Sequence, residues 1–340
     1  MRWSEGPQPL RLGNRERAAT GSGRVLSRTL FHRATENRNT LRETFFAIVN
    51  PAAGGGRSAK LAGPAIARLR ERGLHVDVIA STGPGHAAEL AREAYAQNYR
   101  RFIAVGGDGT AHEILNGIFT HAGPSARISL GFLPLGTGNS FLRDFTKNGA
   151  DAALQALLEN RTRPVDLLRL THSQGEIFAF NLLSVGFTAD VAALTNRYFK
   201  PLGPLGYLFG VFVRVAQLRR RPFALRCDDD KNWDTRRCLF LTFNNSKYTG
   251  GTMLIAPNAD PSDALIEYVR WGPIGRLGLL RMLPRLYDGT HIQHPLASRR
   301  AVRRVEFNLP APVDIMIDGE SASLQIRSLH VLPSAVDVHI

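Results

Sequence analysis

The sequence has few cysteines and no long hydrophobic run. Its only two cysteines, Cys227 and Cys238, cannot form a disulfide framework, so a reducing compartment such as the cytoplasm is the expected location. No uncharged apolar stretch reaches the ~18 residues that suggest a membrane-spanning helix. The longest uncharged stretches, 128–142 and 201–213, are interrupted by glycine and proline. These absences predict a soluble or peripheral protein.

Several common binding motifs are also absent. The chain has no Gly-x-x-x-x-Gly-Lys-Ser/Thr segment, which excludes the P-loop NTPase mechanism, and no Gly-x-Gly-x-x-Gly segment after its first predicted strand. His291 and His294 are three positions apart but lack a helical or cysteine-rich setting, so zinc is not expected. The basic segments contain no interleaved aromatic residues, and nucleic-acid binding is not expected.

The positive charge of the chain is large. The formal net charge is +14 over 340 residues, which favours an anionic partner such as a membrane surface or a polyanionic small substrate. Residues 1–43 hold nine arginines against four glutamates and no apolar core of a signal peptide, and they predict a disordered basic arm. The segments 205–218 and 274–286 are apolar with embedded arginines, a pattern typical of interfacial membrane contact.

The order of apolar runs predicts two domains. Strand-like and helix-like segments alternate through 45–49, 59–72, 74–80, 87–97 and 101–105, followed by a strand at 128–134 and a helix at 151–158. This alternation predicts an α/β domain over 44–164 with a parallel sheet covered by helices. After residue 164, short strand-like runs dominate, which predicts an antiparallel β-sandwich over 165–340. We expect an active-site cleft between the two domains.

Three glycine-rich loops follow strands of the predicted parallel sheet, at 50–56, 106–110 and 136–139. Because loops after parallel strands meet at one sheet edge, they predict a site for nucleotide phosphates. Thr82 and Thr137 offer hydroxyl groups to phosphate, and Asn50 either fixes its loop or binds a phosphate or ribose oxygen. Glu113, three residues after Thr110, is either the partner in a capping box or a ligand of the nucleotide.

Carboxylates near these loops suggest phosphoryl transfer. Asp108 would repel a phosphate unless Mg²⁺ or a substrate hydroxyl lies between them. Asp318-Gly319-Glu320 follows an apolar run and is either a plain hairpin turn or a second acidic group of the same site. Carboxylates could both deprotonate a hydroxyl and hold the metal that neutralises the phosphates. The acidic stretch 260–267 is either a hard-cation site or a solvated turn.

Taken in order, these motifs resemble the diacylglycerol kinase catalytic-domain family, which includes bacterial soluble lipid kinases, sphingosine kinases and ceramide kinases. The resemblance covers residues 44–340 and rests on the glycine loops with Glu113, the segments 181–191 and 256–260, and Asp318-Gly319-Glu320. It implies a parallel-sheet nucleotide domain of the phosphofructokinase and NAD kinase type and a β-sandwich that holds the lipid. It also implies ATP with Mg²⁺ in the cleft, and a last strand or two returning to the first domain.

The resemblance also implies roles for individual residues. Asp318 and Glu320 would act as general base and organise the metal, with Asp108 the rival for the base, and Asp190 would hold the lipid head group. Asp263, with the carbonyl groups of Asp260 and Leu265, would bind a structural Mg²⁺. The expected nucleotide-binding residues are Asn50, Pro51, Gly54, Gly55, Thr82, Gly106, Gly107, Asp108, Gly109, Thr110, Glu113, Gly136, Thr137, Gly138 and Asn139.

Two positions depart from the family pattern. Ser140 stands where many bacterial members have Asp and sphingoid-base kinases have Ala, which leaves the lipid open. Ala264 stands where glycine usually follows the metal-binding Asp, and a turn with positive φ would disfavour alanine.

The sequence thus predicts an ATP-dependent lipid kinase that phosphorylates a hydroxyl of diacylglycerol, a sphingoid base or ceramide in phospholipid or sphingolipid metabolism. We expect it in the cytoplasm, at an anionic membrane surface, with a homodimer as an open alternative to a monomer. Two rival hypotheses are an NAD-kinase-like or phosphofructokinase-like enzyme with a water-soluble substrate, and a catalytically degenerate lipid-sensing protein.

Overall fold

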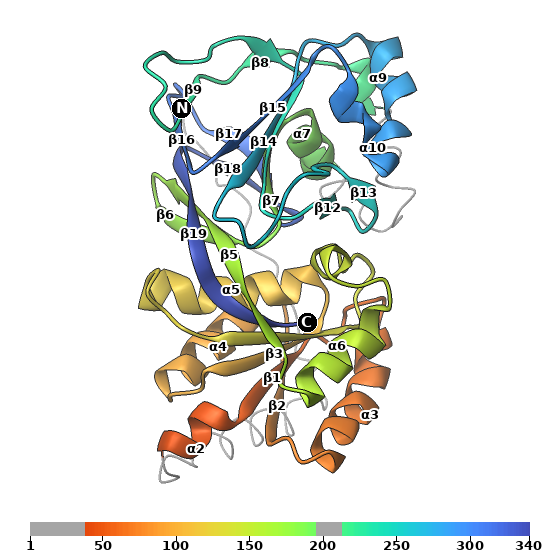
Figure 1. Cartoon of the computed structure of the whole chain (residues 1–340), viewed down its shortest axis with the longest axis vertical. Helices are drawn as coiled ribbons and strands as arrows, with labels where there is room; N and C mark the ends of the chain where they lie inside the picture. The colour runs from red at the N-terminus through yellow and green to blue at the C-terminus, as the bar shows by residue number, and fades with distance from the viewer. Residues whose placement is uncertain (1–37, 195–212) are drawn as a thin grey trace, which may run out of the picture. The chain divides into compact units, whose positions relative to one another are not determined.

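The computed structural model describes residues 38–194 and 213–340 of the chain (Figure 1). The predicted arm lies outside this part up to residue 37, as do residues 205–212 of the first apolar-basic segment. Residues 38–43, which the sequence assigned to the disordered arm, form helix α2 (Arg38–Glu43), and Leu41 is buried against the first domain. Within the described ranges, no helix is long and apolar enough to cross a membrane.

The first domain is a parallel sheet with helices on both faces. Its elements are β1 (Phe45–Val49), α3 (Arg57–Glu71), β2 (Val76–Ala80), α4 (His86–Ala96), β3 (Arg101–Gly106), α5 (Asp108–Ala122), β4 (Ser129–Pro134), the 3-10 helix η1 (Phe141–Asp144) and α6 (Gly149–Leu158). The strands lie in the order β2-β1-β3-β4, all parallel.

Both faces of this sheet are buried, which explains the continuous apolar runs. Along β1, Phe45, Ala47 and Val49 pack with residues of α3 and α6, while Phe46 and Ile48 pack with residues of α4 and α5. Successive side chains of a strand point to opposite faces, so a strand covered by helices on both sides needs apolar residues at every position. The covered sheet brings the ends of β1, β3 and β4 to one edge, where the glycine loops begin.

The rest of the chain forms an antiparallel sandwich. Its elements are β5 (Thr162–His172), β6 (Gly175–Ala179), β7 (Leu182–Gly186), α7 (Phe187–Leu194), β8 (Arg221–Pro222), β9 (Leu225–Cys227), β10 (Arg237–Cys238), β11 (Phe240–Asn244), β12 (Tyr248–Thr249), β13 (Met253–Leu254), β14 (Ile266–Trp271), α9 (Arg276–Met282), α10 (Arg285–Asp288), η4 (Thr290–Gln293), β15 (Ala297–Val302), β16 (Arg304–Phe307), β17 (Val313–Ile317), β18 (Glu320–Leu324) and β19 (Ile326–His339).

One layer of the sandwich is the sheet β15-β14-β11-β7-β17-β18. The other layer contains β5, β6, β9, β16 and β19, which continue the sheet of the first domain with antiparallel pairs. A buried apolar cluster with members on both layers, such as Leu168, Val185 and Leu329, forms the core. The predicted fold class, an α/β domain followed by an antiparallel β-sandwich, is confirmed.

Two strands run through both domains. β19 pairs antiparallel with β5 from Ile326 to His339, with two shifts of register (Figure 1). On its other edge it pairs antiparallel with β16 through 328–330 and in parallel with β4 through Asp337 and Val338. The predicted domain boundary at residue 164 lies inside β5 rather than in a linker. A continuous two-stranded ladder of β5 and β19 therefore joins the domains.

Candidate active site

A cavity of about 850 Å³ lies at the edge of the parallel sheet where β1, β3 and β4 end; we call it the glycine-loop cavity. Thirteen of the residues expected from the sequence line it: Asn50, Pro51, Gly54, Thr82, Gly107, Asp108, Gly109, Thr110, Glu113, Gly136, Thr137, Gly138 and Glu320. Ala52, Ala53, Ser81, Gly83, Pro84 and Gly85 also line it. Of the expected nucleotide-binding and catalytic residues, Gly55, Gly106, Asn139 and Asp318 are not among the lining residues.

The glycines of the cavity allow its loops to pack against one another. A Cβ atom on Gly136 would lie 2.5 Å from Cα of Gly107, and one on Gly54 would lie 2.2 Å from the carbonyl oxygen of Leu135. Gly54 also has a φ of +63°, which is strained for other residues. Any side chain at these positions would force the loops apart, so the glycines are required by the close contact of the loops.

Helix α5 begins inside the cavity and has an open amino-terminal end. Its N-cap residue is Gly107, and no side chain caps it. The N–H groups of Thr110 and Ala111 donate to the Gly107 carbonyl, whereas those of Asp108 and Gly109 have no acceptor within the helix. Unsatisfied N–H groups and the helix dipole make this end of a 15-residue helix attractive to an anion such as phosphate.

Three of the expected polar residues hold the loops in place. The Asn50 side-chain oxygen accepts a hydrogen bond from the Ala52 N–H at 3.1 Å, and the Asn139 amide donates to the Gly136 carbonyl at 3.1 Å. The Glu113 carboxylate accepts from the Ala87 N–H at 3.1 Å, in the first turn of α4. The capping box between Thr110 and Glu113 is therefore not formed, because Glu113 reaches a neighbouring helix instead.

Asp108 lies half-buried at the beginning of α5. Its carboxylate accepts a hydrogen bond from the Ser140 N–H at 2.7 Å, and the Ser140 hydroxyl accepts one from the Gly251 N–H at 2.8 Å. Burial raises the pKa of Asp108, while the backbone bonds from Ser140 and Phe141 oppose this shift. Ser140, which the sequence showed only as a departure from the family pattern, thus connects Asp108 to the loop between β12 and β13.

Asp318 has a different environment from the one its motif suggests. It occupies the two-residue turn between β17 and β18, where Asp318 and Gly319 have φ values of +48° and +91°. Its fully buried carboxylate accepts hydrogen bonds from the N–H groups of Phe180, Asn181 and Leu182 at 3.0, 2.9 and 3.1 Å. A fourth contact, with Nδ1 of His112 on α5, measures 3.1 Å.

Glu320 lies on the other side of the same turn and is exposed. It lines the glycine-loop cavity, and its Oε1 would lie 3.5 Å from a Cβ atom placed on Gly109. The turn therefore separates its two carboxylates: Asp318 is bound to backbone N–H groups in the interior, and Glu320 faces the cavity. The segment 318–320 is thus a hairpin turn, and it also brings one carboxylate, that of Glu320, to the cavity.

Asp190 lies on α7, is buried, and forms an ion pair with the Arg221 guanidinium. It does not line the glycine-loop cavity. Any role in holding a lipid head group would have to compete with this pair.

The loop with the expected metal ligands forms a tight turn. Asp263 accepts a hydrogen bond from the Leu265 N–H at 2.9 Å, and Ala264 has a φ of +60°. The Ala264 N–H donates to the buried carboxylate of Asp166 at 2.7 Å. Burial and the negative charges of Asp260 and Asp166 raise the pKa of Asp263. In the described ranges, no group of three or more His, Cys, Asp or Glu side chains is arranged to hold a metal, so the two carbonyl groups would have to complete this site.

The sequence did not indicate that Asp166, Ser140 and His112 are hydrogen-bond partners of the candidate site residues. They contact Ala264, Asp108 and Asp318, respectively. Asp166 also accepts a hydrogen bond from the Ser334 N–H at 2.7 Å, so it joins two distant loops. A lone carboxylate inside the apolar run 165–170 was the available signal, since a buried charge needs hydrogen-bond partners. Nothing in the local sequence around Ser140 or His112 indicates their partners.

Known proteins with similar sequences decide the family. Residues 44–170 match the family model of the diacylglycerol kinase catalytic domain, and residues 181–340 match that of the YegS C-terminal NAD kinase beta sandwich-like domain. A diacylglycerol kinase from Mycobacterium tuberculosis is 31% identical over 296 residues, which cover 86% of this chain and 93% of the relative. The chain belongs to the diacylglycerol kinase family.

Other relatives agree with this membership. A YegS-like lipid kinase from Xanthomonas axonopodis pv. citri is 32% identical over 282 residues. The match covers 81% of the present chain and 90% of the relative. The fold is also that of a crystal structure described as a diacylglycerol kinase from Bacillus anthracis, with a TM-score of 0.70 and 19% identity over 87% of this chain and 95% of that one. The resemblance stated from the sequence motifs is confirmed, and this chain is a member of a lipid kinase family.

Proposed function

We propose that this diacylglycerol kinase family member binds ATP with Mg²⁺ in the glycine-loop cavity and phosphorylates a hydroxyl group of a membrane lipid. The observation that supports this most is the convergence of the loops after β1, β2, β3 and β4 with Glu320 of the sandwich around one cavity. Its volume of about 850 Å³ lies in the range of small-molecule sites.

The phosphates of ATP would lie against the open end of α5 and the glycine loops, where N–H groups replace their hydration. Thr82 and Thr137, both exposed at the cavity, would donate their hydroxyl groups. Asp108 would hold the Mg²⁺, which supplies positive charge against the phosphates when bound. Asp263 and the carbonyl groups of Asp260 and Leu265 would hold a second, structural Mg²⁺.

We assign the general base to Glu320 rather than to Asp318. The lipid hydroxyl oxygen would attack the γ-phosphorus while the bond to the β-phosphate oxygen breaks, and Glu320 would take the hydroxyl proton as ADP leaves. Asp318 already accepts three backbone hydrogen bonds and one from His112, so it has little capacity left for a substrate proton. Its role would be to position the hairpin that carries Glu320.

Two observations support the choice of acceptor lipid: the names of the relatives and the ion pair of Asp190 in the sandwich domain. The relatives are named diacylglycerol kinase and lipid kinase, and we extend that activity to diacylglycerol, sphingoid bases or ceramide here. The ion pair between Asp190 and Arg221 favours diacylglycerol over a sphingoid base, because the carboxylate that would hold an amino group is already neutralised. We place the reaction at the cytoplasmic surface of a membrane, and a homodimer remains a prediction.

A substrate panel tests the proposal. The full chain would be incubated with γ-labelled ATP and Mg²⁺ and with diacylglycerol, sphingosine, ceramide or polyprenol in mixed micelles, and separately with NAD. We expect label in diacylglycerol, a loss of at least about 100-fold in Glu320→Gln, and normal transfer in the exposed control Glu71→Gln. Label in NAD alone would support the water-soluble rival, and no ATP turnover with any acceptor would support the lipid-sensing one.

A further inference from the structure

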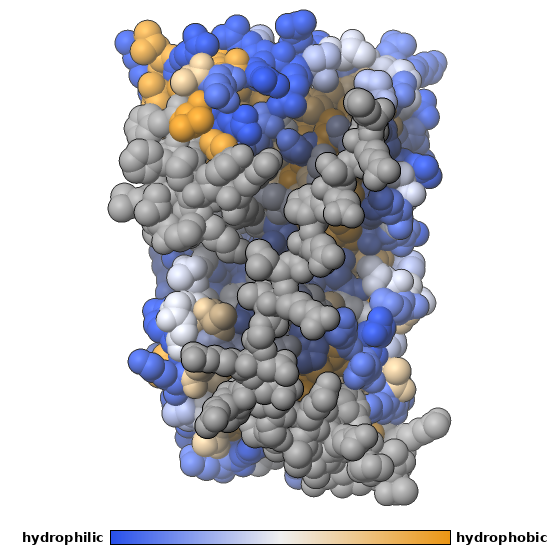
Figure 2. Space-filling view, turned by 180° about the vertical axis from the view of Figure 1, so that it is seen from behind, coloured by the Kyte–Doolittle hydropathy of each residue, from blue (hydrophilic) through white to orange (hydrophobic). Residues whose placement is uncertain are grey.

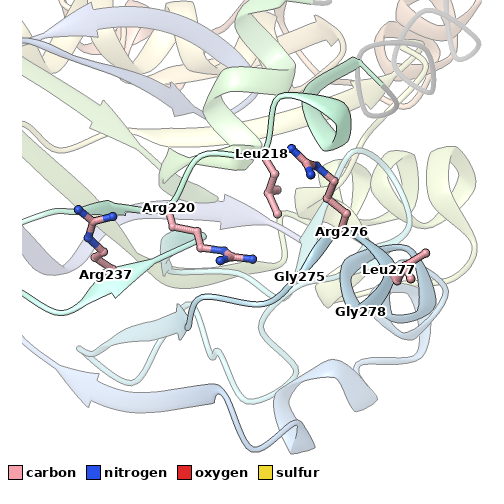
Figure 3. A pocket seen from close by; sticks show the side chains of 7 residues that line it. All are labelled: Leu218, Arg220, Arg237, Gly275, Arg276, Leu277 and Gly278. Carbon is pink, nitrogen blue, oxygen red and sulfur yellow. The ribbon is translucent and has the colours of Figure 1, made fainter.

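A second hollow, of about 680 Å³, lies in the sandwich domain beside α9 and shares no lining residue with the glycine-loop cavity. It is lined by Leu218, Arg220, Arg237, Gly275, Arg276, Leu277 and Gly278 (Figure 3), and we call it the arginine groove. Three of these seven residues are arginines and none is acidic. The lining is therefore strongly positive and selects for an anion.

Two of the arginines are held in fixed directions by the backbone. Nε of Arg220 donates to the Ile274 carbonyl at 3.2 Å, and Nε of Arg276 donates to the Val215 carbonyl at 3.2 Å. These bonds use the Nε–H of each guanidinium, and both side chains line the groove. In the view of Figure 3 the two side chains lie on either side of Leu218, so the groove presents two prearranged guanidinium groups to an anion. Such groups suit the paired oxygens of a phosphate.

An apolar side chain stands exposed next to this positive lining. Leu277 is 72% exposed, the largest exposed fraction among the large apolar side chains of the described residues. It projects from α9, whose other face is fixed to the sandwich by the buried Leu279 and Met282. Figure 2 shows apolar residues gathered beside hydrophilic ones at this end of the sandwich domain. An exposed leucine on an anchored helix, beside arginines, is typical of a surface that enters the boundary between lipid head groups and acyl chains.

We propose that the arginine groove is a docking site for the phosphate group of an anionic phospholipid in a bilayer, with Leu277 inserted among the head groups. This lipid is a docking ligand and is not the lipid that is phosphorylated. The charge complementarity and the neighbouring exposed leucine favour a bilayer over a soluble phosphate compound, since a soluble ligand would gain nothing from Leu277. The net charge of +14 would draw the protein to the same surface.

Vesicle flotation of the full chain tests this site. The vesicles would contain phosphatidylcholine alone or phosphatidylcholine with phosphatidylglycerol, and ATP would be left out so that the result does not depend on kinase activity. Arg220→Gln/Arg276→Gln should lower the partition coefficient for the anionic vesicles about 30-fold, from the typical contribution of a basic residue near such a surface. Leu277→Gln should lower it about tenfold or more through the lost apolar contact.

The matched control is Arg68→Gln/Arg72→Gln, which removes the same charge from exposed positions on and just after α3. We expect this control to bind nearly as well as the unchanged protein. Equal losses in the control and in Arg220→Gln/Arg276→Gln would overturn the site, because binding would then follow total charge. Unchanged binding of Leu277→Gln, with displacement of the protein by inorganic phosphate, would overturn the bilayer as the source of the phosphate group.

Discussion

The two carboxylates of the turn between β17 and β18 should differ sharply when each is neutralised. Asp318→Asn keeps one oxygen, which can still accept from Asn181 and Leu182, but places an NH₂ group against the Phe180 N–H. The Phe180 N–H is then unsatisfied, at a cost of about 1–3 kcal/mol. The hydrogen bond from His112 to the same oxygen is also lost, and the remaining bonds lose their charge-assisted strength. We expect the free energy of unfolding to fall by about 2–4 kcal/mol.

Glu320→Gln should lower activity and leave stability nearly unchanged. The side chain is exposed at the cavity, and no hydrogen bond or ion pair of Glu320 is described in the structure, so the free energy of unfolding should change by less than about 0.5 kcal/mol. Phosphoryl transfer to diacylglycerol should fall by at least about 100-fold, because the proton acceptor is lost.

Urea unfolding followed by tryptophan fluorescence measures the first quantity, since Trp271 is buried in the sandwich. Transfer of labelled phosphate in mixed micelles measures the second. An Asp318→Asn protein that is as stable as the unchanged one but inactive would refute our reasoning, because it would make Asp318 the catalytic carboxylate. Normal transfer by Glu320→Gln would refute the assignment of the base.

Three further predictions concern other parts of the molecule. Ala264→Gly should raise the free energy of unfolding by about 1 kcal/mol in urea titrations, because Ala264 has a φ of +60° that costs alanine more than glycine. Gly136→Ala should weaken ATP binding by more than about tenfold in calorimetry, since its Cβ would collide with Gly107, whereas Gly63→Ala on α3, which meets open space, should bind normally. Burial lowers the pKa of His339 to about 4, so this histidine should destabilise the fold as pH falls from 6.5 toward 4, by up to about 3 kcal/mol. In urea titrations across this pH range, the free energy of unfolding should depend less steeply on pH in His339→Gln than in the unchanged protein. An equal pH dependence of the two proteins would contradict the prediction.

The sequence was sufficient for the elements of the first domain because their signals are local. Every position of β1 is apolar since helices cover both faces, and the glycines mark places where loops touch. The position of Asp318 could not be predicted in this way. Its partners, Phe180 to Leu182 and His112, are 136 to 206 positions away, and local patterns carry no information about such contacts.

Local sequence patterns were also insufficient for two elements near the ends of the described chain, β19 and α2. The sequence predicts only short strand-like runs after residue 164, but β19 is a single strand of 14 residues. Its register shifts at two places, and Ser334 has a φ of +48°, so the alternation of side chains that marks a strand is interrupted although pairing with β5 continues. Helix α2 was missed because it has six residues, and a single buried leucine attaches it to the sheet.

The course of β19 has a consequence for the order in which the protein acquires its structure on the ribosome. The core of the first domain includes Val336 and Val338, and His339 contacts Ser129, which precedes it by 210 positions. Ribosomal synthesis is vectorial, and a domain normally folds once its own residues have emerged. Here the first domain cannot fill its core until residues 336–339 have left the ribosome, so we expect it to stay incomplete, with apolar surface open to chaperones, while the whole sandwich is being synthesised.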